Sequence, residues 1–565
     1  MVGSCRKTSL TTRLAGFLLL LSCPLMALAV ANDAAVNNEI RTRVETLRSG
    51  SDLIIEGATV ASTTVLPALY QRRNFAPAWT NPRSVTQLFD ALRRIDGDGL
   101  DPRDYHLVTL ERLQANLGSG ASADPPRTAD FDMLLTDSLI RLGFHLLIGK
   151  VDPVKVDGNW NMDRTINGRD AVLAVSSAIA EGSVDNLLAA LRPQHIYYRR
   201  LQDALADHRS IAAAGGWPSV PPGPTLKPGM TDERVIALRQ RLAVTQHRPD
   251  ADAQSPLFDA ELEDAVKLFQ HQHGLAADGV VGKATLAALN VPVEGRIDQI
   301  RVNLERARWV LHDMPDEFVL VDIAGFNVRY IRDGQTLWQA RAQVGKPYRR
   351  TPVFRSRITY LEMNPTWTVP PTILRNDVLP AIKRDTGYLQ AKNMKVIDYN
   401  HNVIDPTSID WSRYSGPDFP YLIRQDPGPS NALGRIKFMF PNEHLVYLHD
   451  TPSKSLFERT ERAFSSGCIR VENPYQFAEL LLDDPHTWNR QAIMQAIDSE
   501  RTRKVTLPRP VTVLLLYWTV APDDNGDVIF KQDIYGRDAG ILTGLNSELS
   551  FNQQVFSWAD SARPD

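Results

Sequence analysis

Cysteine is scarce in this chain of 565 residues, which has Cys5, Cys23 and Cys468 and no others. Cys5 and Cys23 lie in an amino-terminal segment with the features of an export signal, so removal of that segment leaves Cys468 as a lone thiol. An intramolecular disulfide is then excluded. Exported compartments oxidise exposed thiols, so a lone cysteine there is either buried and inert or kept for its reactivity.

A strong charge bias is also absent, because 63 basic residues face 66 acidic ones. This balance gives no electrostatic footprint for nucleic acid or an anionic membrane, and we predict no nucleic-acid partner. Long apolar runs are absent too, apart from residues 14–30, and no other run approaches a membrane span. A chain of this length exceeds one compact core, so we expect two to four domains.

The amino terminus predicts a signal peptide over residues 1–31. Arg6, Lys7 and Arg13 precede the apolar run, and small residues ending at Ala29 or Ala31 offer cleavage sites before the polar stretch. The alternative is an uncleaved segment that anchors the protein in the inner membrane, since the run is almost of bilayer length. A lipoprotein site at Cys23 is disfavoured by the large Leu21 that precedes Ser22.

The remainder divides by apolar period and by turn residues. Helical spacings of three and four predict a helical scaffold, three short helices and a helix that braces the next domain, whereas alternating β-branched and aromatic residues later predict a chiefly β domain. A long insertion rich in Pro, Asp and Tyr interrupts that domain, and loops of such length are usually functional or locally ordered. The predicted segments are a loosely ordered polar lead-in at 32–64, the scaffold at 65–211, a Pro- and Gly-rich linker at 212–229, the three-helix module at 230–291, the bracing helix at 296–312, the β domain at 317–500 with its insertion at about 366–430, and a carboxy-terminal β-hairpin extension at 505–565.

The chemistry-bearing segment gives Cys468 a context. It runs from His449-Asp450-Thr451-Pro452 to Ser465-Ser466-Gly467-Cys468-Ile469-Arg470. A thiol nucleophile needs a base or positive neighbours, and a histidine at a strand end supplies one if the fold brings the two together. Gly467 permits a tight turn that aims its own amide and that of Cys468 at a developing oxyanion. Asn473 and Pro474 then predict a helix start.

Two stretches resemble known families. Residues 235–242, 265–275 and 278–290 resemble the peptidoglycan-binding domain of bacterial wall hydrolases. The Ser-x-Gly-Cys-x-Arg motif with its upstream histidine resembles the signature of the L,D-transpeptidase family, and residues 431–438 and 447–452 resemble its large periplasmic branch from Gram-negative bacteria. The resemblance implies a multidomain α+β protein with a helical scaffold, a three-helix wall-binding module and a mostly-β catalytic domain with an inserted capping loop, located in the periplasm. Ser466 departs from the pattern, since many relatives have His or Arg there.

The resemblance also implies roles for residues. Cys468 is the expected acyl acceptor, His449 the general base and then acid, and the amides of Gly467 and Cys468 the oxyanion donors. Ser465 supports the loop, and Arg470 holds a substrate carboxylate, with an ion pair to Glu472 or another acid as the alternative. Further expected pocket residues, for which a core role is the alternative in the two aromatic cases, are Asn431, Tyr447 and Trp367.

No cofactor or metal is expected. His247, His271 and His273 fall in the wall-binding module without a cysteine beside them, and a zinc site on Cys468, His449 and Asp450 lacks the remaining ligand. The predicted reaction is an acyl transfer between two peptidoglycan stem peptides, a donor and an acceptor, that gives 3-3 crosslinks. Carbapenem β-lactams are expected to acylate the thiol, and other wall-synthesis proteins are candidate partners. The alternatives are hydrolysis, attachment of a protein amine, and a non-catalytic wall-binding scaffold.

Overall fold

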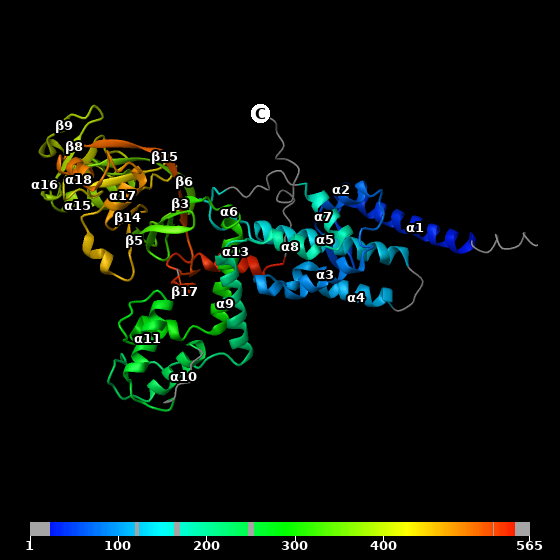
Figure 1. Cartoon of the computed structure of the whole chain (residues 1–565). Helices are drawn as coiled ribbons and strands as arrows, with labels where there is room; N and C mark the ends of the chain where they lie inside the picture. The colour runs from blue at the N-terminus through cyan, green and yellow to red at the C-terminus, as the bar shows by residue number, and fades with distance from the viewer. Residues whose placement is uncertain (1–22, 119–123, 163–169, 247–252, 524, 549–565) are drawn as a thin grey trace, which may run out of the picture. The chain divides into compact units, whose positions relative to one another are not determined.

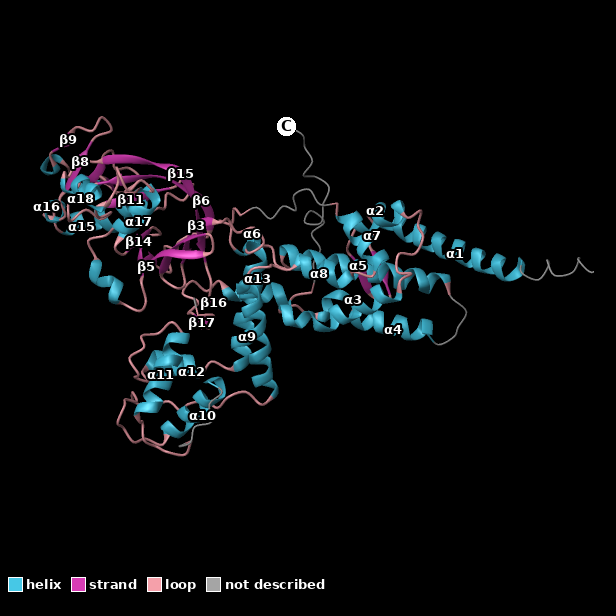
Figure 2. Cartoon of the chain, in the orientation of Figure 1, coloured by secondary structure: helices cyan, strands magenta, loops and turns pink. Residues whose placement is uncertain are grey.

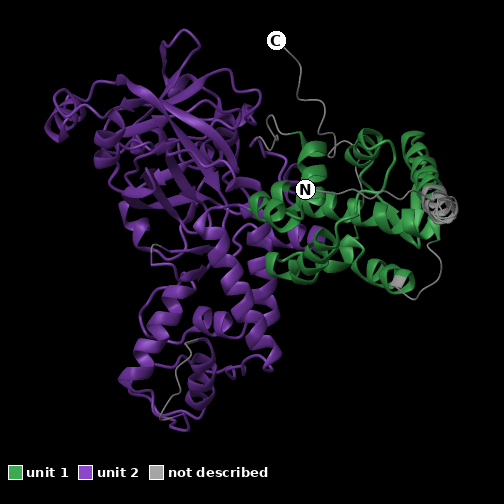
Figure 3. Cartoon of the chain, turned by 45° about the vertical axis from the view of Figure 1, so that its right-hand side comes forward, with its two compact units in different colours: residues 1–148, 165–192, 546–565 green, residues 149–164, 193–545 purple. Residues whose placement is uncertain are grey.

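The computed structural model describes residues 23–118, 124–162, 170–246, 253–523 and 525–548. Residues 1–22 lie outside this range, so the predicted signal peptide lies largely outside the described residues. The chain divides into two compact units (Figure 3), one of residues 1–148, 165–192 and 546–565 and one of residues 149–164 and 193–545. In the described part of the chain, no helix is both long enough and apolar enough to cross a membrane.

The first unit is helical and centres on α5 (Pro125–Ile148), which is buried along most of its length. Neighbouring helices pack on α5 because their apolar residues recur at helical spacing. The other elements of the unit are α1 (Cys23–Arg48), β1 (Leu53–Ile55), β2 (Ala58–Val60), α2 (Val65–Arg72), α3 (Pro82–Arg94), α4 (Leu107–Gly118), α7 (Ala171–Glu181) and α8 (Val184–Leu191).

The prediction of a loosely ordered lead-in at 32–64 is wrong. Helix α1 continues to Arg48, and its Val36, Ile40, Val44 and Leu47 are buried. Their spacings of four, four and three form one helical face. The polar residues of this segment outnumber these four apolar ones, so the helical spacing was not recognised from the composition.

The second unit contains the wall-binding module, with α10 (Arg234–Gln246), α11 (Ala260–Gln272) and α12 (Lys283–Leu289), as the three-helix prediction expected. The preceding segment at 212–229 is not a free linker. Its Val220 and Leu226 are buried in the core of the module, and Leu226 forms a β-bridge with Val281. The Pro and Gly residues there shape a chain that packs on the helices.

Two long helices of the second unit pack together and continue its main core. Helix α9 (Ile196–Ala213) lies against α13 (Val293–Val310), and Leu304 and Ala307 of α13 are buried in the same cluster as the strands that follow. The predicted bracing helix is therefore present. Although α9 was expected to end the scaffold, it belongs to the second unit.

A nine-stranded sheet forms the β domain in this part of the structure (Figure 2). The strand order is β13-β5-β14-β12-β11-β6-β15-β3-β4, and β4 also pairs with β5, so the sheet closes on itself and leaves few exposed edges. The strands are β3 (Glu317–Asp322), β4 (Asn327–Arg332), β5 (Gln335–Gly345), β6 (Phe354–Met363), β11 (Ile436–Met439), β12 (Leu448–His449), β13 (Ala463–Ser465), β14 (Ile469–Val471) and β15 (Arg503–Leu516). This arrangement confirms the multidomain α+β fold.

Two helices follow β14, α17 (Pro474–Leu482) and α18 (Arg490–Asp498). Helix α17 begins at Pro474 as predicted, and its Phe477 packs against Trp338 and Phe438 in the core. The cap differs from the prediction, because Asn473 lies in the left-handed region at φ 45° and its side chain makes no capping hydrogen bond.

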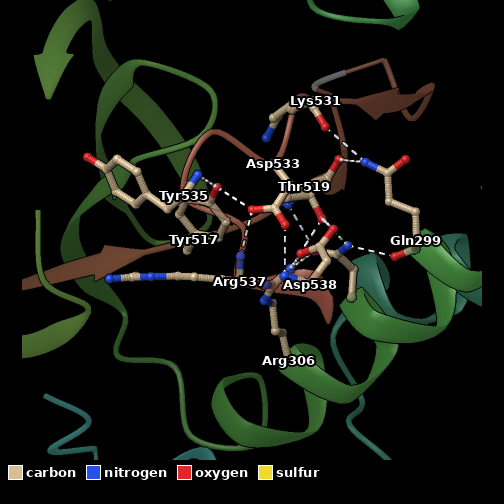
Figure 4. A network of polar contacts seen from close by, with 10 residues as sticks. Gln299, Arg306, Tyr517, Thr519, Lys531, Asp533, Tyr535, Arg537 and Asp538 are labelled. Carbon is tan, nitrogen blue, oxygen red and sulfur yellow. Dashed lines mark hydrogen bonds and ion pairs between the residues drawn. The ribbon is translucent and has the colours of Figure 1, made fainter. Parts of the chain in front are cut away.

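The predicted carboxy-terminal extension begins with a strand of the nine-stranded sheet. Strand β15 lies between β3 and β6, paired parallel to the first and antiparallel to the second. The hairpin of β16 (Val520–Pro522) and β17 (Val528–Phe530) is present, and α19 (Asp538–Asn546) follows it. Figure 4 shows how this segment is fastened to α13: Gln299 donates to the carbonyls of Thr519 and Lys531, and Arg306 pairs with Asp538.

The insertion at about 366–430 folds as a small subdomain with a core of its own. It contains a four-stranded sheet in the order β7-β10-β8-β9 and short helical turns between the strands. Its elements are β7 (Trp367–Thr368), α14 (Pro371–Ile373), η3 (Leu374–Val378), α15 (Leu379–Arg384), α16 (Tyr388–Ala391), β8 (Met394–Ile397), β9 (Val403–Ile404), η4 (Pro406–Ser408), η5 (Trp411–Arg413) and β10 (Leu422–Gln425). This local order is one of the two outcomes expected for so long an insertion.

Candidate active site

The pairing of β12 with β14 brings the two motifs together. The strands are parallel, with Leu448 opposite Ile469 and His449 opposite Arg470, so Cys468 lies across from Tyr447. Residues two apart on a strand share a face of the sheet. Cys468, Arg470, Tyr447 and His449 therefore lie on one face, whereas Leu448 and Ile469 point into the core.

Cys468 is a free, half-buried thiol. Burial raises its pKa, and hydrogen bonds from the amide and hydroxyl of Tyr447 together with the positive charges of Lys437 and Arg470 oppose that rise. The balance still favours the thiol over the thiolate. A base is therefore needed to activate the sulfur at neutral pH.

His449 can serve as that base. Its side chain is buried, and its Nδ1 lies 2.5 Å from the backbone oxygen of Asp450, which can only accept a hydrogen bond. Nδ1 therefore carries the proton and Nε2 keeps its lone pair. Desolvation, with the nearby charge of Arg470, lowers the pKa of His449 to about 3, so the imidazole is neutral across the physiological range.

Arg470 is half-buried and close to the sulfur. Its Nη1 donates to Gln343 Oε1 at 3.2 Å, and its Nε has no hydrogen-bond partner. The alternative of an ion pair with Glu472 is excluded, because Glu472 binds Arg341 at 2.6 Å. Within the described residues no carboxylate contacts the Arg470 guanidinium, which leaves it available to an external anion.

Lys437 and Glu362 belong to the same row of side chains but were missed from the sequence. Lys437 pairs across the sheet with His449 on one side and with Glu362 on the other. The Lys437 Nζ lies 4.1 Å from the centre of the Tyr447 ring, and burial lowers its pKa while Glu362 and Cys468 raise it. The alternation Ile436-Lys437-Phe438 could have indicated Lys437, since it places this lysine on the face of the strand opposite to that of two core residues.

The loop before Cys468 is held by hydrogen bonds. Ser465 Oγ donates to the Cys468 carbonyl at 2.5 Å, in agreement with its predicted supporting role, and accepts from the Gly467 amide at 3.1 Å. Gly467 has φ 117°, which side-chain-bearing residues rarely adopt. The expectation that the Gly467 amide faces an oxyanion is therefore wrong, because Ser465 already uses that amide. The Cys468 amide makes no hydrogen bond to any described residue.

Thr351 supports the same loop from behind. Its hydroxyl donates to the Gly467 carbonyl at 2.9 Å and accepts from the Gly345 amide at 2.9 Å. The Tyr535 hydroxyl in turn donates to the Gly345 carbonyl at 2.6 Å and accepts from the Thr351 amide. Tyr535 is one of the residues of the network in Figure 4, so the carboxy-terminal segment positions the cysteine loop through two contacts.

A family model for the L,D-transpeptidase catalytic domain matches residues 316–504, which include all the residues described at this site except Tyr535. The chain carries an L,D-transpeptidase catalytic domain. Two further models match, a scaffold domain over residues 64–205 and a "Putative peptidoglycan binding domain" over residues 231–289. The order of the three matches agrees with the resemblance in the sequence.

A curated relative from Haemophilus influenzae named "Putative L,D-transpeptidase" is 35% identical over 289 residues, which are 50% of this chain. The match spans 58% of the length of that relative. Solved L,D-transpeptidase structures are also similar. One from Xylanimonas cellulosilytica has 17% identity over 52% of this chain and 100% of its own, with a TM-score of 0.18, and one from Stackebrandtia nassauensis has 14% over 53% and 96%, with 0.21. Scores this low carry no argument about the site.

Of the three further pocket residues predicted for the L,D-transpeptidase domain, one lies beside Cys468 and two do not. Tyr447 lies beside Cys468 and His449, with its ring 5.7 Å from the imidazole. Asn431 is buried, and its side chain bonds the carbonyls of Pro365 and Asp426 and the amide of Leu433. All its polar groups are used within the fold, so we assign it a structural role. Trp367 packs against the core of the capping subdomain and makes no contact with the cysteine loop that the structure records.

Ser466, the residue that departs from the family pattern, connects the L,D-transpeptidase loop to the capping subdomain. Its hydroxyl accepts from Arg349 at 2.9 Å, and Arg349 pairs with Asp377 of η3 at 2.5 Å. Asp450 is likewise structural, since it accepts from the Arg435 amide and from Lys454. In the described ranges, no cluster of three or more His, Cys, Asp or Glu residues has the arrangement of a metal site.

Proposed function

We propose that this protein is a peptidoglycan L,D-transpeptidase in which Cys468 attacks the carbonyl of the third stem residue, usually meso-diaminopimelate. The terminal D-alanine leaves, and the acyl group passes to an amine of a second stem to give a 3-3 crosslink. The observation that supports this proposal most is the common face of Cys468, His449 and Arg470, with an imidazole whose Nδ1 lies against the Asp450 carbonyl, so that Nε2 is the basic nitrogen.

The first half-reaction forms a thioester. As the Cys468 sulfur forms a bond to the carbonyl carbon, its proton passes to Nε2 of His449, and the carbonyl oxygen becomes an oxyanion. The Cys468 amide and the Tyr447 hydroxyl are the donors proposed to stabilise that oxyanion. When the intermediate collapses, the C–N bond breaks and the His449 imidazolium gives its proton to the departing D-alanine amine.

The second half-reaction reverses these steps. The acceptor amine attacks the thioester carbon, His449 takes the proton from that amine, and the C–S bond breaks as the proton returns to sulfur. Arg470 is proposed to bind a stem carboxylate, and Lys437 is proposed to stabilise negative charge at the sulfur as the C–S bond breaks. The enzyme needs no cofactor for this sequence. Water or a protein amine as acceptor is the alternative outcome.

The setting proposed for this activity is the periplasm, which the protein reaches by an amino-terminal signal or in which it stays anchored if the signal is uncleaved. The module at 230–291 is proposed to bind the wall. Carbapenems are proposed inhibitors, because a strained β-lactam offers an acyl donor to the thiol. Other wall-synthesis proteins are proposed as partners.

The test is product analysis. Purified chain is incubated with disaccharide tetrapeptides, and the products are separated and sequenced by tandem mass spectrometry. We expect dimers with 3-3 links and one D-alanine released per link. Tripeptide monomers without dimers would assign water as the acceptor, and tetrapeptides that stay intact would exclude the proposed reaction.

The first prediction concerns Arg470. We expect Arg470→Lys to raise KM for the tetrapeptide donor about 10- to 100-fold, because an ammonium keeps the charge but loses two-point binding of a carboxylate. The matched control is Arg341→Lys on β5, whose guanidinium already pairs with Glu458 and Glu472. Steady-state kinetics of D-alanine release measure both. Equal KM values in the two variants would show that Arg470 does not bind substrate.

The second prediction concerns the support of the loop. We expect Thr351→Val to lower the free energy of unfolding by about 1–3 kcal/mol, because the buried Gly345 amide and Gly467 carbonyl lose their partner. D-alanine release should slow about tenfold, because a displaced loop misplaces the sulfur. The control is Thr512→Val in β15, a buried threonine with no side-chain hydrogen bond recorded in the structure. Similar losses in both variants would contradict the proposed support.

A further inference from the structure

A second candidate binding site lies in the second unit, away from Cys468. The α9 pocket, as we call it, has a volume of about 280 Å³ and is lined by α9, by the wall-binding module, by Arg296 of α13 and by the turn before β17. Figure 1 labels these elements. The volume is near the lower end of small-molecule pockets, which suits a group the size of one sugar or amino acid.

One wall of the α9 pocket is a continuous series of rings. His273 stacks on Phe530 with ring centres 5.5 Å apart, and Phe530 contacts His208 at 5.4 Å. His208 then meets the edge of Trp217 at 6.1 Å. Nδ1 of His208 and Nδ1 of His273 each donate to a backbone carbonyl, so each Nε2 remains an acceptor. Such a wall offers flat apolar faces and two acceptors to a ligand.

Two buried arginines also line the α9 pocket. Arg241 is 1% exposed and lies 3.9 Å from the centre of the Trp217 ring, and Arg296 is 7% exposed and lies over Phe530. Their recorded hydrogen bonds go to neutral groups only: Arg241 donates to the Leu289 carbonyl and the Thr245 hydroxyl, and Arg296 donates to the Ala288 carbonyl and Gln299 Oε1.

No carboxylate pairs with either guanidinium in the described part of the chain, and the Arg296 Nε is buried without a partner. Two like charges that burial brings together are unfavourable unless an anion joins them. Burial accordingly lowers the pKa of Arg241 to about 9 and that of Arg296 to about 10. Gln299 fixes Arg296 in place, since it also binds the Thr519 and Lys531 carbonyls in Figure 4.

The rim of the pocket has a mixed charge. Asp203, Asp207 and Asp527 are exposed there, and Arg200 lies beside them. The positive charge is thus concentrated at the buried end, while the acids face solvent. A ligand would place its anionic group inward and its polar or cationic groups outward.

We propose that the α9 pocket binds a carboxylate carried on a sugar or similar body, with Arg241 and Arg296 holding the carboxylate and the ring wall holding the body. A planar guanidinium matches a carboxylate in two-point geometry. The inference rests on the proposed function only for the source of the ligand, which is peptidoglycan. Within peptidoglycan, this chemistry occurs in the lactyl carboxylate of muramic acid in glycan without stems and in the terminal carboxylate of a stem.

Binding is measured by calorimetry on the full chain carrying Cys468→Ala, so that no probe is consumed. The probes are N-acetylmuramic acid, N-acetylglucosamine as the ring without the lactyl carboxylate, and the free stem tetrapeptide. We expect N-acetylmuramic acid or the tetrapeptide to bind and N-acetylglucosamine to bind at least about tenfold more weakly. Because the tetrapeptide also binds at the Cys468 site as the proposed donor, the source is identified by the probe whose affinity falls in the pocket variants. Equal affinity for the two sugars together with no affinity for the tetrapeptide would overturn the proposal.

Variants test the two arginines. Arg241→Gln and Arg296→Gln should each weaken the bound probe about tenfold or more, whereas Arg234→Gln, which removes a module arginine that pairs with Asp232, should not. Unchanged affinity in both pocket variants would overturn the assignment. If a variant fails to fold, the comparison of the three probes on the chain that carries only Cys468→Ala tests the proposal instead. Formation of 3-3 dimers without binding of any probe would refute this inference and leave the proposed function standing. Binding of a probe without formation of dimers would refute the proposed function and leave this inference standing.

Discussion

Replacing Cys468 with alanine is expected to abolish both D-alanine release and dimer formation, a loss on the order of 10⁶-fold in kcat, as is typical when a covalent nucleophile is removed. Cys468 is a free cysteine, and no other described side chain of its row offers a comparable nucleophile. Cys468→Ser is expected to be nearly as inactive, because burial that already disfavours a thiolate disfavours an alkoxide far more.

The measurement combines product analysis with intact-protein mass spectrometry. The unmodified chain should gain the mass of one carbapenem, and neither variant should gain it. Thermal unfolding serves as the control, because sulfur makes only weak hydrogen bonds, here to the Leu445 carbonyl at 4.0 Å and from Tyr447, and their loss should change the melting temperature little. Turnover by a folded alanine variant would show that the acyl group is carried elsewhere.

The proposed catalytic pair, Cys468 and His449, could be singled out from the sequence because its signals are local. A histidine closes a short apolar strand, and a glycine precedes the cysteine at the start of another. The helices of the wall-binding module and the strands β3, β4 and β5 were predictable for the same reason, since each carries its own period and turn.

What could not be predicted depends on pairing between distant segments. Lys437 and Glu362 enter the site only through the register of β11 with β12 and β6, and no local pattern sets that register. Strand β15 was assigned to an extension because its order in the sheet, between β3 and β6, follows from contacts with residues 140 to 194 positions earlier. Thr351 escaped notice because its importance lies in two hydrogen bonds of its hydroxyl, one to the Gly467 carbonyl and one from the Gly345 amide.

His449→Gln is expected to slow acylation by the tetrapeptide about 10²- to 10⁴-fold at pH 7, the range typical for loss of a general base. With a pKa of about 3, the His449 imidazole stays basic in form down to acidic pH, so the unmodified chain should show no inflection near pH 6.5. The glutamine variant must rely on the thiolate. Because the pKa of Cys468 is raised, its rate should increase about tenfold per pH unit through the neutral range.

The free energy of unfolding should also depend on pH through His449. The pKa of His449 is lower in the folded chain than the value of about 6.5 in the unfolded chain, so the unfolded state binds the extra proton between those values. The contribution to folding is therefore complete above pH 6.5 and is lost as pH falls toward 3. At about 1.4 kcal/mol per pH unit, the unmodified chain should lose about 2 kcal/mol more than His449→Gln between pH 7 and pH 5. Denaturant unfolding at the two pH values measures the difference, and equal losses would mean that His449 is protonated in the folded site and cannot accept the proton of Cys468.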